Sequence, residues 1–205
     1  MFNILALVSV IASMILLKTF VGVFPSILAA VIRWKENINI ESSVRLSRDR
    51  DLTALAMIIP FCLTIFRFRI YDPRFIANLA DPSRLWAVLG IFSVYLLFRK
   101  SATLLGRPRR IAQKTYAAAT KSANTYFILL TLSLLLFCSI ASFMDVHLNT
   151  IRQVSIGLSA LIYGVYIIRK VQIFASSCSL FTAFLYLCAL EILPSGILII
   201  SDVIF

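Results

Sequence analysis

Residues 124–144 read NTYFILLTLSLLLFCSIASFM and contain no charged side chain. The nearest charges on either side are those of Lys121 and Asp145. A helix needs about 20 predominantly apolar residues to cross the roughly 30 Å hydrocarbon core of a lipid bilayer. This stretch therefore predicts a transmembrane helix, and the remainder of the chain has to fit a membrane protein.

The composition of the whole chain supports this prediction. Of the 205 residues, 60% are hydrophobic and only 14% are charged, whereas about 25% of the residues of a soluble domain are charged. The charged residues cluster between apolar runs, which is typical of several spans joined by short loops. Since no loop has room for a soluble domain of about 50 residues or more, we expect a single transmembrane domain over residues 1–205.

The apolar runs predict an all-α, polytopic bundle of about six transmembrane helices. The expected spans lie near residues 2–24, 52–70, 85–104, 124–144, 151–168 and 180–200. Asp81 and Pro82 form a favourable helix start before the third span, and Arg169 and Lys170 mark the end of the fifth. Counts of five or seven spans remain open.

The distribution of basic residues predicts the orientation of the chain. The formal net charge is +11, and Lys and Arg are more numerous in the loops that follow the first, third and fifth spans than in the other loops. Basic loops face the cytoplasm, so we expect both termini in the periplasm. Because these residues flank spans, we assign them to orientation and to anionic lipid headgroups rather than to nucleic acid.

The most basic stretch, residues 107–121, reads RPRRIAQKTYAAATK. Its alanines and scattered apolar side chains are typical of a helix that lies on the membrane surface. We expect it to anchor the cytoplasmic face, and the alternative is a docking face for anionic lipid, ribosomal RNA or a cytosolic partner. Its basic residues are Arg107, Arg109, Arg110, Lys114 and Lys121.

Motifs of known catalytic or cofactor chemistry are absent from the sequence. Nothing in it matches a nucleophile elbow, a zinc-protease helix motif or a phosphate-binding loop. The four cysteines lie in or beside apolar stretches without a CxxC pair, and the single histidine, His147, lies in a loop. The sequence thus predicts no enzymatic activity, no cofactor and no metal site.

One carboxylate lies inside the last expected span, in the stretch YLCALEILP at residues 186–194. If that span begins near residue 180, Glu191 lies roughly 17 Å into the hydrocarbon core by the rise per residue of a helix. Ionisable groups at such depth face a partner, a cavity or the bundle interior. Two interpretations remain open: a carboxylate that locks the bundle, and one that forms a proton, ion or substrate site. Pro194 frees a backbone carbonyl one turn earlier, and Arg67 is a candidate partner at similar depth.

The same stretch carries a resemblance. Cys188, Leu190, Glu191, Ile192 and Pro194 follow a Cys-x-Leu-Glu-Ile-x-Pro pattern. The segment around them, residues 167–199, resembles a family of integral membrane proteins from Bacteroidota that is classified as a domain of unknown function. The remainder of the chain agrees with that family in length, hydropathy and multi-span layout. The resemblance implies a Gram-negative inner membrane and marks Glu191 and Pro194 as signature residues, but it implies no reaction, cofactor or ligand.

Together these observations favour a small non-enzymatic subunit of a larger inner-membrane protein complex, acting as an accessory or assembly partner. The chain has no loop long enough for a catalytic head, no internal repeat of the kind found in many transporters, and few polar groups to line a pathway. The expected partners are the bilayer, anionic lipid headgroups and other membrane protein subunits. The alternatives are a small proton-coupled transporter with Glu191 as its titrating group and an intramembrane lipid-handling enzyme.

Overall fold

The computed structural model describes residues 2–73, 76, 78–105, 113–176, 187–192 and 195–196. Every regular element in these ranges is helical, which confirms the all-α class for the part of the chain that the structure describes. The elements are α1 (Phe2–Ile32), α2 (Trp34–Ser42), α3 (Val44–Ala56), α4 (Ile58–Arg67), α6 (Asp81–Leu105), α7 (Gln113–Phe143), α8 (Leu148–Ala175) and the π-helical turn η1 (Cys188–Ile192).

Three helices are long and apolar enough to cross a membrane, so the protein is a membrane protein. These segments are Ser83–Thr103 in α6, the whole of α7 and the whole of α8. They overlap the spans expected near residues 85–104, 124–144 and 151–168. A shorter apolar helical segment, Lys18–Ile32, belongs to α1. Because only three such helices occur in the described ranges, the expected number of about six spans is not confirmed.

The span expected near residues 52–70 has a one-residue break in its helix at Met57, although Met57 still donates to the carbonyl of Thr53 at 3.0 Å and accepts from the amide of Phe61 at 3.1 Å. Helix α3 ends at Ala56, and α4 begins at Ile58 after a turn at Met57. The cause is Pro60, which has no N–H to donate to the carbonyl of Ala56 and whose ring collides with that carbonyl in a continuous helix. Helix α4 alone extends over about 15 Å, half of the hydrocarbon core. The last expected span, near residues 180–200, lies mostly outside the described residues.

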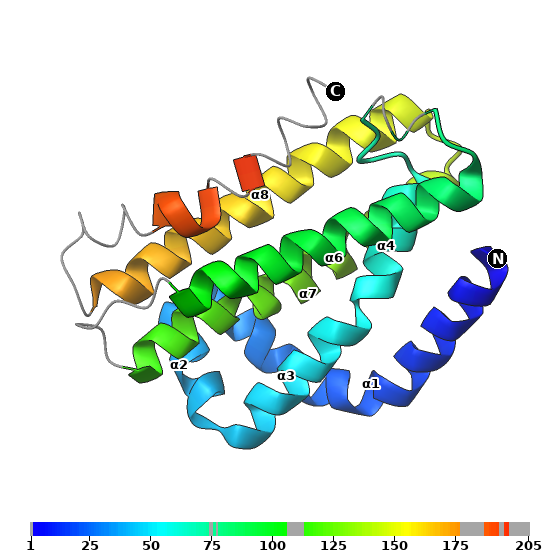
Figure 1. Cartoon of the computed structure of the whole chain (residues 1–205). Coiled ribbons are helices and arrows are strands. Elements are labelled where there is room, and N and C mark those ends of the chain that lie inside the picture. The colour runs from blue at the N-terminus through cyan, green and yellow to red at the C-terminus, as the bar shows by residue number, and fades with distance from the viewer. Residues whose placement is uncertain are drawn as a thin grey trace.

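The three long helices run side by side along the length of the molecule, and α7 runs in the opposite direction to α6 and α8 (Figure 1). Asp145 adopts a left-handed backbone conformation with φ of 52° in the turn between α7 and α8, a conformation that Asp tolerates better than most residues. Helices α6 and α8 therefore both end on the side where α7 begins. The short helix α2 packs against α7, α8 and α1 on that side.

An aromatic cluster joins α4, α6 and α7 in the core. The ring of Phe61 lies 5.0 Å from that of Phe92 and 5.1 Å from that of Phe127, measured between centroids. Leu134 and Cys138 of α7 are buried beside these rings. Such ring pairs contribute roughly 0.5–1.5 kcal/mol beyond the burial of their apolar area, so this cluster fixes the packing of the middle of the bundle.

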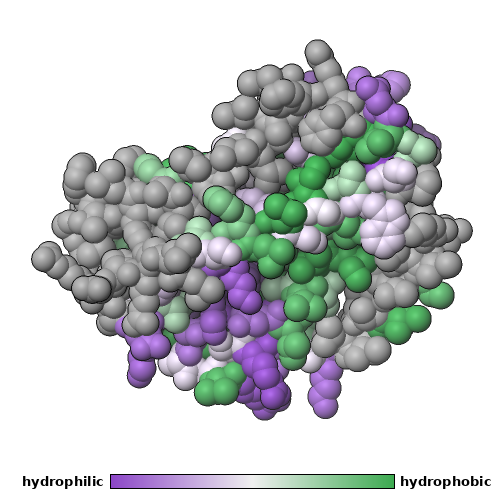
Figure 2. All heavy atoms as spheres, in the orientation of Figure 1, coloured by the Kyte–Doolittle hydropathy of each residue, from purple (hydrophilic) through white to green (hydrophobic). Residues whose placement is uncertain are grey.

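Large apolar side chains also cover much of the outer surface of the long helices. Val94, Leu97, Leu136 and Leu161 each expose more than half of their surface. Figure 2 shows a hydrophobic band on the described part of one face, next to a hydrophilic area at its lower edge. An exposed apolar band of this kind fits contact with lipid.

Candidate functional site

A buried ion-paired cluster surrounds Glu191, and we call it the Glu191 cluster. Its members are Tyr95, Arg99, Tyr163, Tyr166, Lys170, Glu191 and Ser195. The Glu191 side chain is 1% exposed, and its Oε1 atom pairs with the guanidinium of Arg99 at 3.0 Å. The same oxygen accepts a hydrogen bond from Nζ of Lys170, whose side chain is 2% exposed. One carboxylate oxygen thus joins η1 to α6 and α8.

Tyrosine side chains complete the cluster. The hydroxyl of Tyr166 accepts hydrogen bonds from Arg99 at 2.7 Å and from Lys170 at 3.0 Å. Both cations also lie over the Tyr166 ring, at 5.7 Å and 5.4 Å from its centroid. The ring quadrupole attracts cations, and more strongly where water is excluded. Tyr166 therefore stabilises the two positive charges that face Glu191.

A second line of hydroxyl groups holds the backbone of η1. The hydroxyl of Tyr163 lies 3.0 Å from the carbonyl oxygen of Glu191 and 3.1 Å from Oγ of Ser195. Oγ of Ser195 lies 3.2 Å from the hydroxyl of Tyr95 on α6. These contacts connect α6, α8 and the segment around η1 independently of the ion pairs.

Helical spacing explains how the chain assembles this site. Tyr163, Tyr166 and Lys170 follow one another at three and four residues, so they share one face of α8. Tyr95 and Arg99 have the same relation on α6. Arg99 lies about 9 Å before the end of α6, and Lys170 lies about 8 Å before the end of α8. Both helices end on the same side of the bundle. The two faces then meet at equal depth.

The sequence carries a signal for this site in the spacing of its basic and tyrosine residues. Arg169 and Lys170 were expected to end the fifth span, because charges in hydrocarbon are costly. In the structure α8 continues to Ala175, and Lys170 lies inside the helix because Glu191 and Tyr166 compensate its charge. Lys170 follows Tyr166 by one helical turn, and Arg99 follows Tyr95 by one turn. This pairing of a cation with a tyrosine on the same helix face is the pattern that predicts such a cluster.

The electrostatic balance of the Glu191 cluster is unequal. Two cations face one carboxylate, and only Arg99, with 19% of its side chain exposed, has access to the outside. Removing one partner of a buried ion pair costs about 3–5 kcal/mol, because the remaining charge stays buried without compensation. The arrangement therefore acts as a strong mechanical link between α6, α8 and η1.

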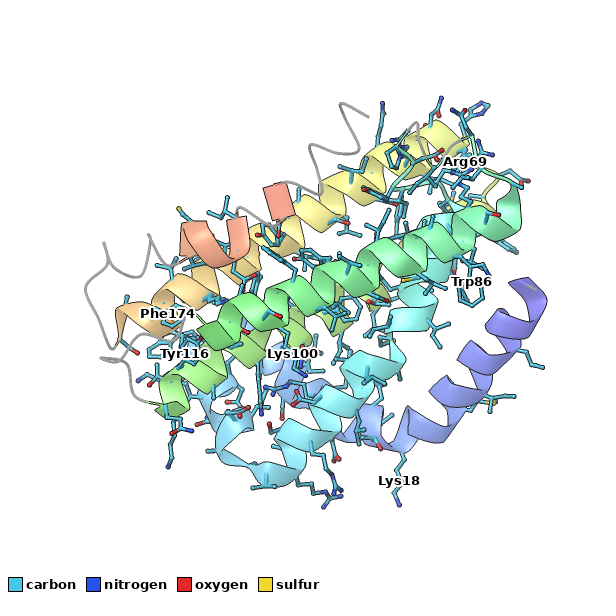
Figure 3. All side chains as sticks on the ribbon, viewed as in Figure 1. Lys18, Arg69, Trp86, Lys100, Tyr116 and Phe174 are labelled. Carbon is cyan, nitrogen blue, oxygen red and sulfur yellow. The ribbon has the colours of Figure 1, made fainter. Side chains whose placement is uncertain are left out.

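The other residues singled out from the sequence do not join this cluster. Arg67 is exposed at the last position of α4, and the ion pairs of Glu191 go to Arg99 and Lys170 instead. Figure 3 shows Arg69 at the opposite end of the bundle from Phe174, which follows Lys170 by one turn. Arg67, two residues before Arg69, is therefore far from Glu191.

The predicted basic surface is described only in part. Lys114 lies exposed in the first turn of α7. Lys121 lies further along α7, and its side chain is 40% exposed. Arg107, Arg109, Arg110 and Pro194 lie outside the described residues. The described part of the expected surface helix, residues 113–121, forms the first turns of α7.

Lys121 belongs to a second polar cluster, the Glu41 network, which comprises Glu41, Ser47, Arg50, Asp51, Lys121 and Asn124. Lys121 donates to Oε1 of Glu41 at 2.8 Å, and the fully buried Arg50 pairs with Glu41 at 3.1 Å and with Asp51 at 2.9 Å. Asn124 donates to Asp51 at 2.9 Å. The network ties α2 and α3 to α7, so the charged segment that follows the first expected span consists of packed helices.

The network changes the acidity of Glu41. Burial alone would raise the pKa of this carboxyl, but hydrogen bonds from Lys121, Ser47 and Arg50 and the charge of Arg50 lower the pKa below its ordinary value. Glu41 is thus held as a carboxylate by its neighbours. Its part in the molecule is to join helices, since its oxygens are occupied by three side chains of the same chain.

Metal-binding geometry does not occur in the described ranges. No group of three or more His, Cys, Asp or Glu side chains is close enough there to hold a metal ion. Cys62 and Cys138 are buried free thiols, and Cys188 is a partly buried one.

Comparison with known protein families identifies a family for this chain. The sequence profile of a domain of unknown function (DUF4271) matches residues 3–200. No curated protein matches the chain. No solved structure matches it either.

Proposed function

Since the chain belongs to the DUF4271 family, we propose that it is a small non-enzymatic subunit of a larger membrane protein complex, acting as an accessory or assembly partner. One observation carries the proposal. Glu191 is the only acidic side chain that is fully buried among the described residues, and its contacts go to cations and hydroxyls of the same chain. This buried carboxylate is thereby engaged in holding helices together.

Catalysis and transport need a polar group that reaches a substrate, an ion or a proton path. Protonation of Glu191 would remove the charge that compensates both Lys170 and Arg99, and two buried cations would then face each other unpaired. That state is costly in a low-dielectric interior. The arrangement supports a rigid bundle that other subunits contact over a large part of its apolar surface.

The location of the protein is part of the same proposal. We propose the inner membrane of a bacterium of the Bacteroidota, with about six spans, both termini in the periplasm and Cys188 to Pro194 as a family signature. The ends of α6 and α8 and the start of α7 would then face the cytoplasm. Lys100 near the end of α6, Lys114 in the first turn of α7 and Arg169 near the end of α8 support this orientation, because basic residues favour the cytoplasmic side.

A proton-coupled transporter is the second candidate, and one observation favours it. The hydroxyls of Tyr95, Ser195 and Tyr163 form a hydrogen-bonded line that ends at the backbone of Glu191. Lines of hydroxyl groups can pass protons towards a carboxylate. In that case Glu191 would be the titrating group.

Purification from the native membrane tests the first proposal. The full chain, tagged at one end and extracted in mild detergent, should migrate together with at least one other polypeptide in a fixed ratio. The same tag on an unrelated inner-membrane protein is the control. A lone monomer or homodimer without a partner would contradict the subunit role.

Uptake experiments in liposomes test the second proposal. Proton-coupled uptake of any solute that disappears in Glu191→Gln and persists in Arg67→Gln would favour the transporter. Arg67→Gln is a suitable control because it removes an exposed charge at the other end of the bundle.

A further inference from the structure

An open groove lies between α1 and α3, separate from both the Glu191 cluster and the Glu41 network. Its volume is about 530 Å³. The residues that line it are Lys18, Thr19, Gly22, Arg45, Leu46, Arg48 and Asp49. In Figure 3 Lys18 points away from the helix bundle at its lower edge. The groove thus opens outwards, where lipid or solvent reaches it.

The charge of the groove is unbalanced. Lys18, Arg45 and Arg48 contribute three positive charges, and Asp49 contributes one negative charge. Arg45 reaches Asp49 only at 3.8 Å, and its side chain is 87% exposed. Exposed pairs of this kind contribute little free energy, so Arg45 can change partners at low cost. The groove is therefore suited to a ligand with at least one negative charge.

An apolar stripe continues from Lys18 along α1. Leu7, Ile11, Met14 and Val21 each expose about half of their surface or more, and with Lys18 they recur at alternating intervals of four and three residues. They therefore share one face of the helix. From Lys18 to Leu7 the helix rises about 16 Å, which is about half of the 30 Å hydrocarbon core. The stripe thus has the length of the acyl chains of one leaflet.

Gly22 leaves the floor of the groove open. A Cβ atom added to this residue would meet no other atom within 4 Å. The lack of a side chain therefore creates space beside Lys18 without being needed for helix packing. This is the position at which a bulky headgroup can approach the backbone of α1.

We propose that this groove binds the phosphate group of an anionic phospholipid, whose acyl chains lie along the stripe of Leu7, Ile11 and Met14. Arginine and lysine bind phosphate oxygens through charge-assisted hydrogen bonds. A basic site joined to an apolar face is the arrangement expected at the boundary between headgroups and acyl chains. The inference does not depend on the proposed subunit function, because a transporter with this groove would bind the same lipid.

Lipid binding to the full chain in detergent, measured by native mass spectrometry after delipidation, tests the inference. Phosphatidylglycerol should bind the wild type, and the affinity for phosphatidylethanolamine should be lower by a factor of about ten or more. Each of Lys18→Gln, Arg45→Gln and Arg48→Gln should lower the affinity for phosphatidylglycerol about fivefold. The triple variant Arg33→Gln, Lys100→Gln, Lys114→Gln is the control, since it removes three exposed cations elsewhere and should change the affinity less than twofold.

A variant that changes no charge separates the groove from general electrostatic attraction. Gly22→Leu should fill the groove and abolish most phosphatidylglycerol binding, while Gly90→Leu, at another exposed glycine with open space around it, should not. Replacing glycine by leucine raises helix propensity, so both variants should fold. Equal binding by Gly22→Leu and wild type would overturn the proposal. Displacement of the lipid by millimolar inorganic phosphate alone would also overturn it, because the acyl chains would then contribute nothing.

Discussion

The ion pairs of Glu191 lead to a quantitative prediction for the stability of the bundle. In Glu191→Gln, Lys170 and Arg99 remain buried without a compensating charge. A pair at 3.0 Å in an effective dielectric of about 20 has a Coulomb energy of roughly 5 kcal/mol. The observed cost of removing one partner of a buried pair is about 3–5 kcal/mol. We therefore expect the free energy of unfolding to fall by about 3–5 kcal/mol in Glu191→Gln.

The effect of Lys170→Met should be smaller, although Lys170 is just as buried. This variant leaves Glu191 paired with Arg99 and removes the excess positive charge of the cluster. The loss is then close to that of a hydrogen bond to a charged group, about 1.5–3 kcal/mol. A larger loss of unfolding free energy in Glu191→Gln than in Lys170→Met therefore reports the charge balance of the cluster. A loss of packing alone would not produce this difference.

Reversible unfolding in mixed detergent micelles, followed by circular dichroism, gives the required free energies. Arg67→Gln is the matched control, and its stability should change by about 0.5 kcal/mol or less, as for other exposed substitutions. If Glu191→Gln unfolded within 0.5 kcal/mol of the wild type, the carboxylate would not hold the bundle together. If Lys170→Met were the more damaging variant, the assigned charge balance would be wrong.

Three further predictions concern other parts of the chain. The pKa of Glu41 lies below its ordinary value in the folded state, so this carboxyl stabilises the folded state at any pH above its ordinary pKa. That stabilisation is lost as the pH falls through the lower pKa of the folded state. The free energy of unfolding, measured from pH 7 to pH 3, should show this loss in the wild type and not in Glu41→Gln. Arg169 donates hydrogen bonds at 3.0 Å to the last carbonyls of α1, so Arg169→Gln should cost about 1–3 kcal/mol, against little change in Lys100→Gln. Pro60→Ala should join α3 and α4 into one helix. The amide that this substitution introduces should then be protected from hydrogen exchange, whereas exchange at the rate of an unprotected amide would show that another cause breaks the helix.

The helical class and the positions of α6, α7 and α8 could be predicted because they depend on local composition. A run such as residues 124–144 leaves the backbone only one means of satisfying its hydrogen bonds in lipid. The break at Met57 was harder to predict. Pro60 was visible in the sequence, but prolines occur within transmembrane helices wherever neighbouring groups satisfy the freed carbonyl.

The candidate site could be predicted only in part. Glu191 was identified from its position in an apolar run, because a single carboxylate there has few explanations. Its partners were not, because Arg99 lies near the end of the third expected span and Lys170 marks the end of the fifth. Whether a cation ends a helix or lies within it depends on a partner that is distant in sequence. Arg99 precedes Glu191 by 92 residues, and no local pattern encodes a contact of that separation.

Glu191 and Lys170 act as a coupled pair that holds α8 to the segment around η1. A double-mutant cycle with Glu191→Gln, Lys170→Met and the combined variant measures this coupling directly from their free energies of unfolding. The structure predicts a coupling of about 2 kcal/mol or more. The combined variant should therefore lose at least that much less unfolding free energy than the two single variants lose together. Additive effects within about 0.5 kcal/mol would contradict this coupling.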